Sequence, residues 1–200
     1  AVRLTTQESY ESSPVWSPDG RSLAFASDRN GQFDVFLMPS EGGPARQLTF
    51  NSASELPTAF TPDGRHVLFN ASIQDPATSA LFPTGALTEL YSVPVSGGRI
   101  TQVLATPAEM VSYDKRGTRF LYQDRKGFED EWRKHHTSSI TRDIWLYDTA
   151  TGHHTNLTDR AGEDRNPVFS PDGNQVYCLS ERDGGTFNVY SFPLDRPSEA

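Results

Sequence analysis

The feature of this sequence that most constrains its fold is an internal repeat. Residues 14–20 read Pro-Val-Trp-Ser-Pro-Asp-Gly and return at 167–173 with phenylalanine in place of tryptophan. A third copy occupies 59–64, and a degenerate fourth copy occupies 111–117. Proline presets the first turn position, aspartate bonds its own backbone, and glycine accepts a positive φ. Each copy therefore predicts a strand, a tight turn and a second strand.

Short apolar runs recur at matching distances from each turn. The expected second strands are 23–26, 67–69, 120–122 and 176–179, the third strands 34–37, 89–92, 143–146 and 188–191, and the fourth strands 46–49, 101–104 and 155–158. Runs of β-branched and aromatic residues between turn signals are typical of strands. The sequence thus predicts an all-β protein, a β-propeller of four-stranded meander blades, with any helix confined to two long insertions.

The repeats define one propeller domain over residues 1–200. Their approximate boundaries are 8–49, 51–105, 107–159 and 161–200. The last repeat lacks a fourth strand, whereas residues 1–6 match the fourth-strand pattern and are expected to form an extra outer strand. Two interpretations stay open, a closed four-bladed propeller or part of a larger one, because propellers have roughly four to eight blades.

Four aromatic residues align at the ends of the expected first strands. They are Trp16, Phe60, Tyr113 and Phe169. We expect them at equivalent positions near the interfaces between blades.

Composition excludes several classes of protein. The net charge of −8 disfavours a general role on nucleic acid or anionic lipid, and no run of 18 apolar residues could span a membrane. The single cysteine, Cys178, allows no intrachain disulfide or cysteine zinc site and is expected as a buried strand thiol. The sequence opens on Ala1-Val2-Arg3 with no basic, then apolar, then small-residue leader, so we expect a protein that is either cytosolic or has had its export signal removed.

The repeats resemble a known propeller type. The Ser-Pro-Asp-Gly turn, the run 23–29 and the Gly-Gly turn before 47–49 resemble TolB-type propeller repeats, and this resemblance covers nearly the whole chain. Residues 127–139, 141–145 and 162–167 further resemble the N-terminal propeller of tricorn-like proteases. In that family the propellers precede a PDZ domain and a serine peptidase domain, and they are thought to filter, channel or bind peptide. Residues 1–200 contain no such peptidase region, and the third repeat departs from the Ser-Pro-Asp-Gly pattern, so we do not expect the activity to carry over.

The resemblance implies a function without catalysis in the chain itself. We expect a non-catalytic propeller domain of a tricorn-like serine protease that binds or channels peptide substrates or products. The alternative is a TolB-like envelope scaffold for protein–protein interaction. The expected partners are a peptide, a protein, or a peptidase domain of the same parent chain, and the expected compartment is the periplasm or cell envelope, with the cytoplasm as the alternative.

Candidate catalytic and metal-binding residues do not form a coherent set. No Gly-x-Ser-x-Gly elbow is present, and Ser138-Ser139 beside His135-His136 is expected to be a polar loop. The histidine pairs 135–136 and 153–154 should lie at opposite ends of a strand, which argues against one shared metal site. Residues 28–34 faintly resemble a calcium loop, but Asn30-Gly31 favours a hairpin. We therefore expect no catalytic residue, no metal and no cofactor.

The candidate binding surface follows from blade topology. Insertions at about 70–88 and 123–142 both join second to third strands and so share one face, while the short Asp-Gly and Gly-Gly turns mark the other face. The second insertion is charged and aromatic. The residues expected to bind peptide or partner are Trp132, Arg133, Lys134, His135, His136 and Arg142. Arg133 and Lys134 are expected to pair a peptide's terminal carboxylate, unless Glu129, Asp130 and Glu131 neutralise them.

Overall fold

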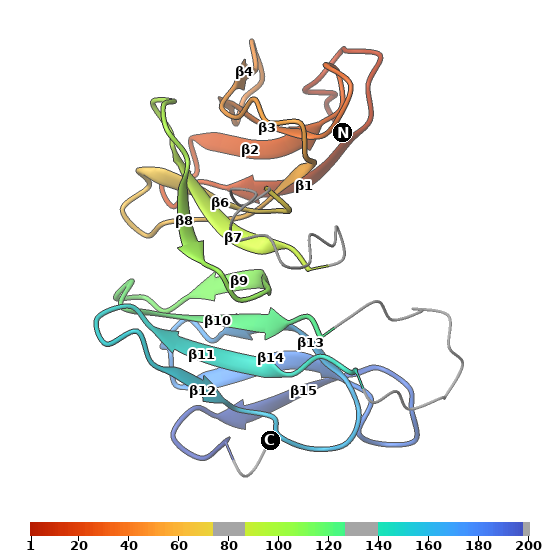
Figure 1. Ribbon diagram of the computed structural model, residues 1–200, viewed down its shortest axis with the longest axis vertical. Helices are drawn as coiled ribbons and strands as arrows, with labels where there is room; N and C mark the ends of the chain where they lie inside the picture. The colour runs from red at the N-terminus through yellow and green to blue at the C-terminus, as the bar shows by residue number, and fades with distance from the viewer. Residues whose placement is uncertain (74–86, 127–139, 198–200) are drawn as a thin grey trace, which may run out of the picture. The chain divides into compact units, whose positions relative to one another are not determined.

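The computed structural model describes residues 1–73, 87–126 and 140–197 (Figure 1). These residues form fifteen β-strands and no α-helix. The strands are arranged in antiparallel meander sheets, so the expected all-β propeller architecture is confirmed. Contact density divides the chain into two compact units, Ala1–Thr106 and Pro107–Ala200.

The first unit contains two four-stranded sheets, with strand orders β1-β2-β3-β4 and β5-β6-β7-β8. The strands of the first sheet are β1 (Glu11–Trp16), β2 (Ser22–Ser27), β3 (Asp34–Pro39) and β4 (Arg46–Gln47). Those of the second sheet are β5 (Glu55–Phe60), β6 (His66–Ala71), β7 (Glu89–Pro94) and β8 (Thr101–Leu104). Each sheet is a simple meander, because consecutive strands are always neighbours.

The second unit contains one four-stranded and one three-stranded sheet. The strands of the third sheet are β9 (Ala108–Tyr113), β10 (Arg119–Asp124), β11 (Ile144–Asp148) and β12 (His154–Asn156). Those of the fourth sheet are β13 (Asp164–Phe169), β14 (Gln175–Ser180) and β15 (Asn188–Pro193). Every second, third and fourth strand overlaps the run from which it was expected.

The N-terminal segment does not form a strand in this structure. Residues 1–6 carry no strand assignment, and Leu4 packs against the cluster of Leu23, Phe25, Phe36 and Met38 in the first sheet. The fourth sheet has no fourth strand among the described residues. Completion of that sheet by the N-terminal segment stays a prediction.

The repeated turns have the hydrogen bonds that the motif requires. In the first copy, Asp19 accepts from the Ser17 hydroxyl at 2.6 Å and from the Arg21 amide at 3.0 Å, while Gly20 has a φ of 69°. In the degenerate copy, Asp114 stands where Ser17 stands and accepts from the Thr118 amide at 3.0 Å. A carboxylate thus replaces the hydroxyl, which explains why the turn survives without the Ser-Pro-Asp-Gly sequence.

A β-bulge recurs in the first strand of the repeats. The third residue of β1, β9 and β13 has a positive φ, 52° at Ser13, 52° at Met110 and 53° at Asn166. In β5 the equivalent residue is Pro57, whose ring cannot adopt a positive φ, and the register still shifts next to it. The bulge is therefore a recurring feature of the first strand and does not depend on one type of side chain.

Within each unit, an aromatic residue joins the two sheets. Phe60 of the second sheet packs with Ala24, Val35 and Leu48 of the first. Phe169 of the fourth sheet packs in the same way with Leu121, Ile144 and Leu157 of the third. Both aromatic side chains are buried, as expected for the interface between blades.

The equivalent tryptophan behaves differently. Trp16 ends β1 at the expected position, but its side chain is 61% exposed. Its place at the end of the first strand was predicted correctly. In the part of the chain that is described, no helix is long and apolar enough to cross a lipid bilayer.

Candidate functional site

Most of the residues expected to bind peptide cannot be placed. Trp132, Arg133, Lys134, His135 and His136 lie in the segment 127–139, outside the described residues. Arg142 is described, and it stands two residues before β11. The described part of the candidate site therefore consists of the residues at the two ends of the insertion and the sheets that carry them.

Arg142 is buried between two glutamates. Its Nη1 donates to Glu163 Oε1 at 2.6 Å, and its Nε lies 3.7 Å from Glu109 Oε2. Arg165 Nε donates to the same Glu163 oxygen at 2.6 Å. Burial alone would favour the protonated acid, but the hydrogen bonds from Arg165 and Arg142 outweigh it and lower the pKa of Glu163. Glu163 is thus a fixed negative charge between two cations.

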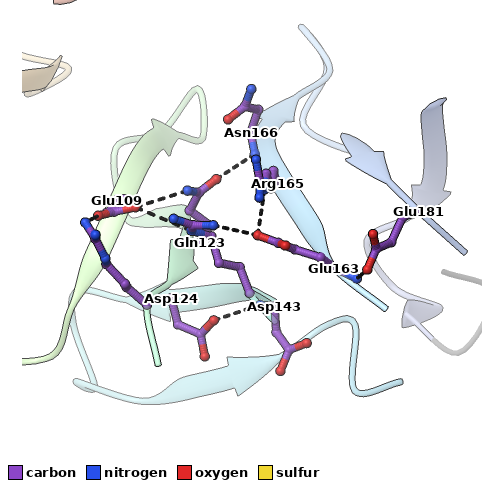
Figure 2. Close-up of polar contacts among 10 residues, drawn as sticks. Glu109, Gln123, Asp124, Asp143, Glu163, Arg165, Asn166 and Glu181 are labelled. Atoms are coloured by element: carbon purple, nitrogen blue, oxygen red, sulfur yellow. Dashed lines mark hydrogen bonds and ion pairs between the residues drawn. The ribbon is translucent and has the colours of Figure 1, made fainter. Parts of the chain in front are cut away.

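This ion-pair network connects the third sheet to the fourth. Glu109 in β9 accepts from Arg125 at 3.0 Å and from Gln123 at 3.2 Å. Gln123 Oε1 in turn accepts from the backbone amide of Asn166 at 2.8 Å, at the bulge of β13 (Figure 2). The bulge turns that amide toward β10, so it gives the network a backbone donor as well as side chains.

A second polar cluster closes the base of the insertion. The Asp143 amide donates to Asp124 Oδ1 at 2.7 Å, and the Asp124 amide donates to the Asp143 carbonyl at 3.1 Å. Lys126 Nζ donates to Asp143 Oδ2 at 2.6 Å and lies 3.7 Å from Asp124 Oδ2. Burial raises the pKa of Asp124. The residues on both sides of segment 127–139 are therefore joined by hydrogen bonds and ion pairs.

A groove on the turn side of the first unit was not expected from the sequence. It has a volume of about 520 Å³ and is walled by the turns at Pro18-Asp19 and Pro62-Asp63, with Phe60 among its apolar residues. Its lining comes from two repeats, so no single stretch of sequence could have shown it. It lies at the strand ends opposite those that carry the insertions.

The described residues offer no catalytic or metal-binding arrangement of the kinds considered. No group of three or more histidine, cysteine or acidic side chains among residues 1–73, 87–126 and 140–197 could hold a metal ion. The Cys178 thiol is buried, and burial raises its pKa to about 11, so it is a poor nucleophile at neutral pH. His154 is half-buried, and its Nδ1 lies 2.8 Å from the Tyr122 hydroxyl, so this ring nitrogen already has a hydrogen-bond partner.

Comparison with known proteins identifies the family. The model of the tricorn protease N-terminal β-propeller domain matches residues 1–199. The chain belongs to this family. Among curated relatives, this tricorn-type propeller is 28% identical over 199 residues to tricorn protease homolog 1 of Streptomyces coelicolor, covering 98% of this chain and 17% of the relative. It is also 29% identical over 174 residues to the uncharacterized peptidase YuxL of Bacillus subtilis, covering 86% of this chain and 22% of that protein.

Solved structures show the same fold. TolB from Acinetobacter baumannii matches 96% of the tricorn-type propeller chain and 43% of its own, with a TM-score of 0.72 at 20% identity. The crystal structure of the tricorn protease matches 96% of this chain and 18% of its own, with a TM-score of 0.69 at 22% identity. This chain spans 22 to 51% of the length of three curated relatives that it matches.

Proposed function

We propose that this chain is a non-catalytic propeller domain of a tricorn-like serine protease, and that it binds or channels peptide substrates or products. The observation that carries the proposal is the family match over residues 1–199. The chain itself would supply binding, while a peptidase domain of the same parent protein would supply catalysis. The expected compartment is the periplasm or cell envelope, which fractionation of the producing cells would test.

The proposed binding residues lie on and beside the charged insertion. Trp132, Arg133, Lys134, His135 and His136 would contact the peptide, with the two basic side chains taking its terminal carboxylate. Arg142 would hold the base of the site, because Glu163 already accepts one of its N–H groups and Glu109 lies beside another. Support for a fixed base comes from the pairing of Asp124 and Lys126 with Asp143 where the insertion leaves and rejoins the sheet.

A paired charge reversal tests the carboxylate site. In the Arg133→Glu, Lys134→Glu variant, peptides with a free carboxylate should bind at least tenfold more weakly, while amidated peptides should be unaffected. The matched control is Lys115→Glu with Arg116→Glu, an adjacent exposed basic pair in a turn of the same repeat. Equal loss for both peptides, or equal effects of both variants, would contradict the proposed site.

A TolB-like scaffold is the second candidate, supported by the structural likeness to TolB. It predicts that neither kind of peptide binds and that a defined envelope protein copurifies with the complete protein. Recovery of peptidase activity from the complete protein, lost when its peptidase region is removed, would instead favour the tricorn-like function.

A further inference from the structure

The groove in the first unit combines apolar side chains with an acidic rim. Its volume of about 520 Å³ lies within the range of roughly 300–1,000 Å³ that is typical of ligand sites. Its apolar surface includes the side chains of Leu37, Phe60 and Val95. Its described lining residues include two carboxylates, those of Asp19 and Asp63, and no basic side chain. We refer to this hollow as the turn groove.

The two acidic turns meet at the turn groove. One turn contains Pro18 and Asp19, the other contains Pro62 and Asp63, and all four residues are exposed. A Cβ built on Gly64 would lie 3.8 Å from Pro18 Cδ, so the two turns pass close to each other. The two carboxylates therefore belong to one site, although they come from different repeats.

Both aspartates are held by the same pattern of hydrogen bonds. In each turn, Oδ1 accepts from the hydroxyl two residues before it at 2.6 Å and from the backbone amide two residues after it at 3.0 Å. The bond from the hydroxyl, followed by the bond from the amide, lowers the pKa of Asp19 and of Asp63. Both groups are therefore charged at neutral pH, and Oδ2 is the oxygen that a ligand would meet.

The basic residues near the turn groove leave these charges accessible. Arg21 and Arg65, which follow the two turns, are both exposed. Arg65 Nε lies 3.9 Å from Asp63 Oδ2, and the two side chains are 81% and 56% exposed. An exposed ion pair at this distance is weak, so a ligand can replace it. Arg46 donates to the Val95 carbonyl, which engages its guanidinium with the backbone.

This combination of surfaces fits an arginine side chain. Its apolar stem can pack on proline and aliphatic side chains, while its guanidinium keeps a charged head at the rim. The guanidinium has five N–H donors in a planar fork and can donate to two carboxylates, whereas a lysine ammonium is a compact point charge. An acidic ligand would be repelled by Asp19 and Asp63.

The second unit has the opposite charge at the equivalent turn. In the degenerate copy of the motif, Lys115 and Arg116 take the places of Pro18 and Asp19, and both basic side chains are exposed. The pair of acidic turns is therefore a property of the first unit and does not follow from the repeat as such.

We propose that the turn groove binds an arginine residue flanked by apolar residues in a peptide segment. The guanidinium pairs with Asp19 and Asp63, and the apolar neighbours pack on Leu37, Phe60 and Val95. This site goes beyond the proposed carboxylate site, because it lies at the opposite strand ends and recognises the opposite charge.

Peptide binding to the complete protein tests the charge recognition. The probe is an acetylated and amidated peptide, Gly-Leu-Arg-Leu-Gly, and its matched control has citrulline, a neutral isostere, in place of arginine. In titration calorimetry the arginine peptide should bind at least about tenfold more tightly, because charge-assisted hydrogen bonds are lost in the control. No binding, or equal affinities, would overturn the proposal. Both peptide ends are blocked, so this result is independent of Arg133 and Lys134.

A double substitution locates the site. Asp19→Asn combined with Asp63→Asn removes both charges and keeps the side-chain oxygen that each turn needs. Affinity for the arginine peptide should fall at least about tenfold, while affinity for the citrulline peptide should not change. The control is Asp172→Asn, because Asp172 accepts the same two hydrogen bonds in the turn of the fourth repeat. Equal losses in both variants would overturn the proposal.

Photo-crosslinking tests the location without changing the protein. Benzoylphenylalanine replaces the leucine that follows arginine in the probe peptide. The crosslink should lie within residues 17–22 or 60–64, or at residue 37 or 95, which line the turn groove. A crosslink at any other part of the complete protein, or no crosslinked product, would overturn the proposal.

Discussion

Asn51 and Arg160 occupy equivalent positions, each four residues before a buried acid that begins a first strand. Asn51 donates through Nδ2 to Glu55, and Arg160 donates through Nη2 to Asp164. The fourth repeat therefore holds its buried acid with a cation, whereas the second repeat holds its acid with a neutral amide.

The difference leaves two carboxyl groups together in the first unit. Glu55 is 0% and Asp34 1% exposed, and Glu55 Oε2 and Asp34 Oδ1 have no donor among the described side chains. Burial is the main cause that raises the pKa of both groups, and the negative charge of Asp34 further raises the pKa of Glu55. Such a pair is stable when it shares one proton.

The first prediction concerns pH. A folded-state pKa above the unfolded value means that the folded chain binds protons more tightly, so this stabilisation is complete below the unfolded pKa of about 4 and is lost as pH rises. Denaturant unfolding measures the unfolding free energy of the wild type and of Glu55→Gln at several pH values. The wild-type value minus the Glu55→Gln value should fall between pH 5 and pH 8. A constant difference across this range would show that the two carboxyl groups do not share a proton.

The second prediction compares one substitution at two glutamates. Glu55→Gln supplies an N–H that can donate to Asp34, so the unfolding free energy at pH 8 should rise by about 1–2 kcal/mol. Glu163→Gln removes the charge that pairs with Arg142 and Arg165, so the unfolding free energy should fall by about 3–5 kcal/mol. Chemical denaturation of both variants at pH 8 measures the signs, and equal signs would contradict the assignment of their environments.

The third prediction concerns the bulge in β9. Met110 is 52% exposed with a φ of 52°, a conformation that costs an L-residue about 1 kcal/mol or more. Met110→Gly should therefore raise the unfolding free energy by about 0.5–1 kcal/mol. The β-branched control Met110→Val should lower it, since branching at Cβ makes a positive φ still less favourable. Thermal unfolding of the two variants gives the comparison, and a loss of stability in Met110→Gly would count against strain at this position.

The fourth prediction separates two equivalent aromatic residues. In the 200-residue chain, Phe60→Ala should cost about 3–5 kcal/mol of unfolding free energy because Phe60 is buried in a core shared by two sheets. Trp16→Ala should cost less than about 1 kcal/mol because Trp16 is largely exposed. Equal losses of unfolding free energy for the two truncations would show that Trp16 is buried in solution.

Much of the fold could be read from the sequence because its determinants are local. The strands end at Trp16, Phe60, Tyr113 and Phe169 as predicted, because each is followed at once by a tight turn. In three of the four copies the proline, aspartate and glycine of that turn act on their own backbone. The degenerate copy at 111–117 still forms its turn because Asp114 supplies the acceptor that the turn needs. Strand alternation likewise follows from neighbours in the chain.

The environments of the polar and aromatic side chains were decided only by tertiary structure. Arg142 was expected to bind a peptide, and nothing in its local sequence indicates that two glutamates distant in the sequence, Glu109 and Glu163, would lie on either side of it. Glu55 and Glu163 are both buried glutamates, but their opposite pKa shifts depend on which strand the fold places beside each. Trp16 and Phe60 share a motif and differ in burial because, within the first unit, the first sheet packs against Phe60 and no preceding sheet packs against Trp16. Local sequence determined where the strands begin and end, whereas burial and charge pairing depend on surfaces that exist only after the sheets have packed.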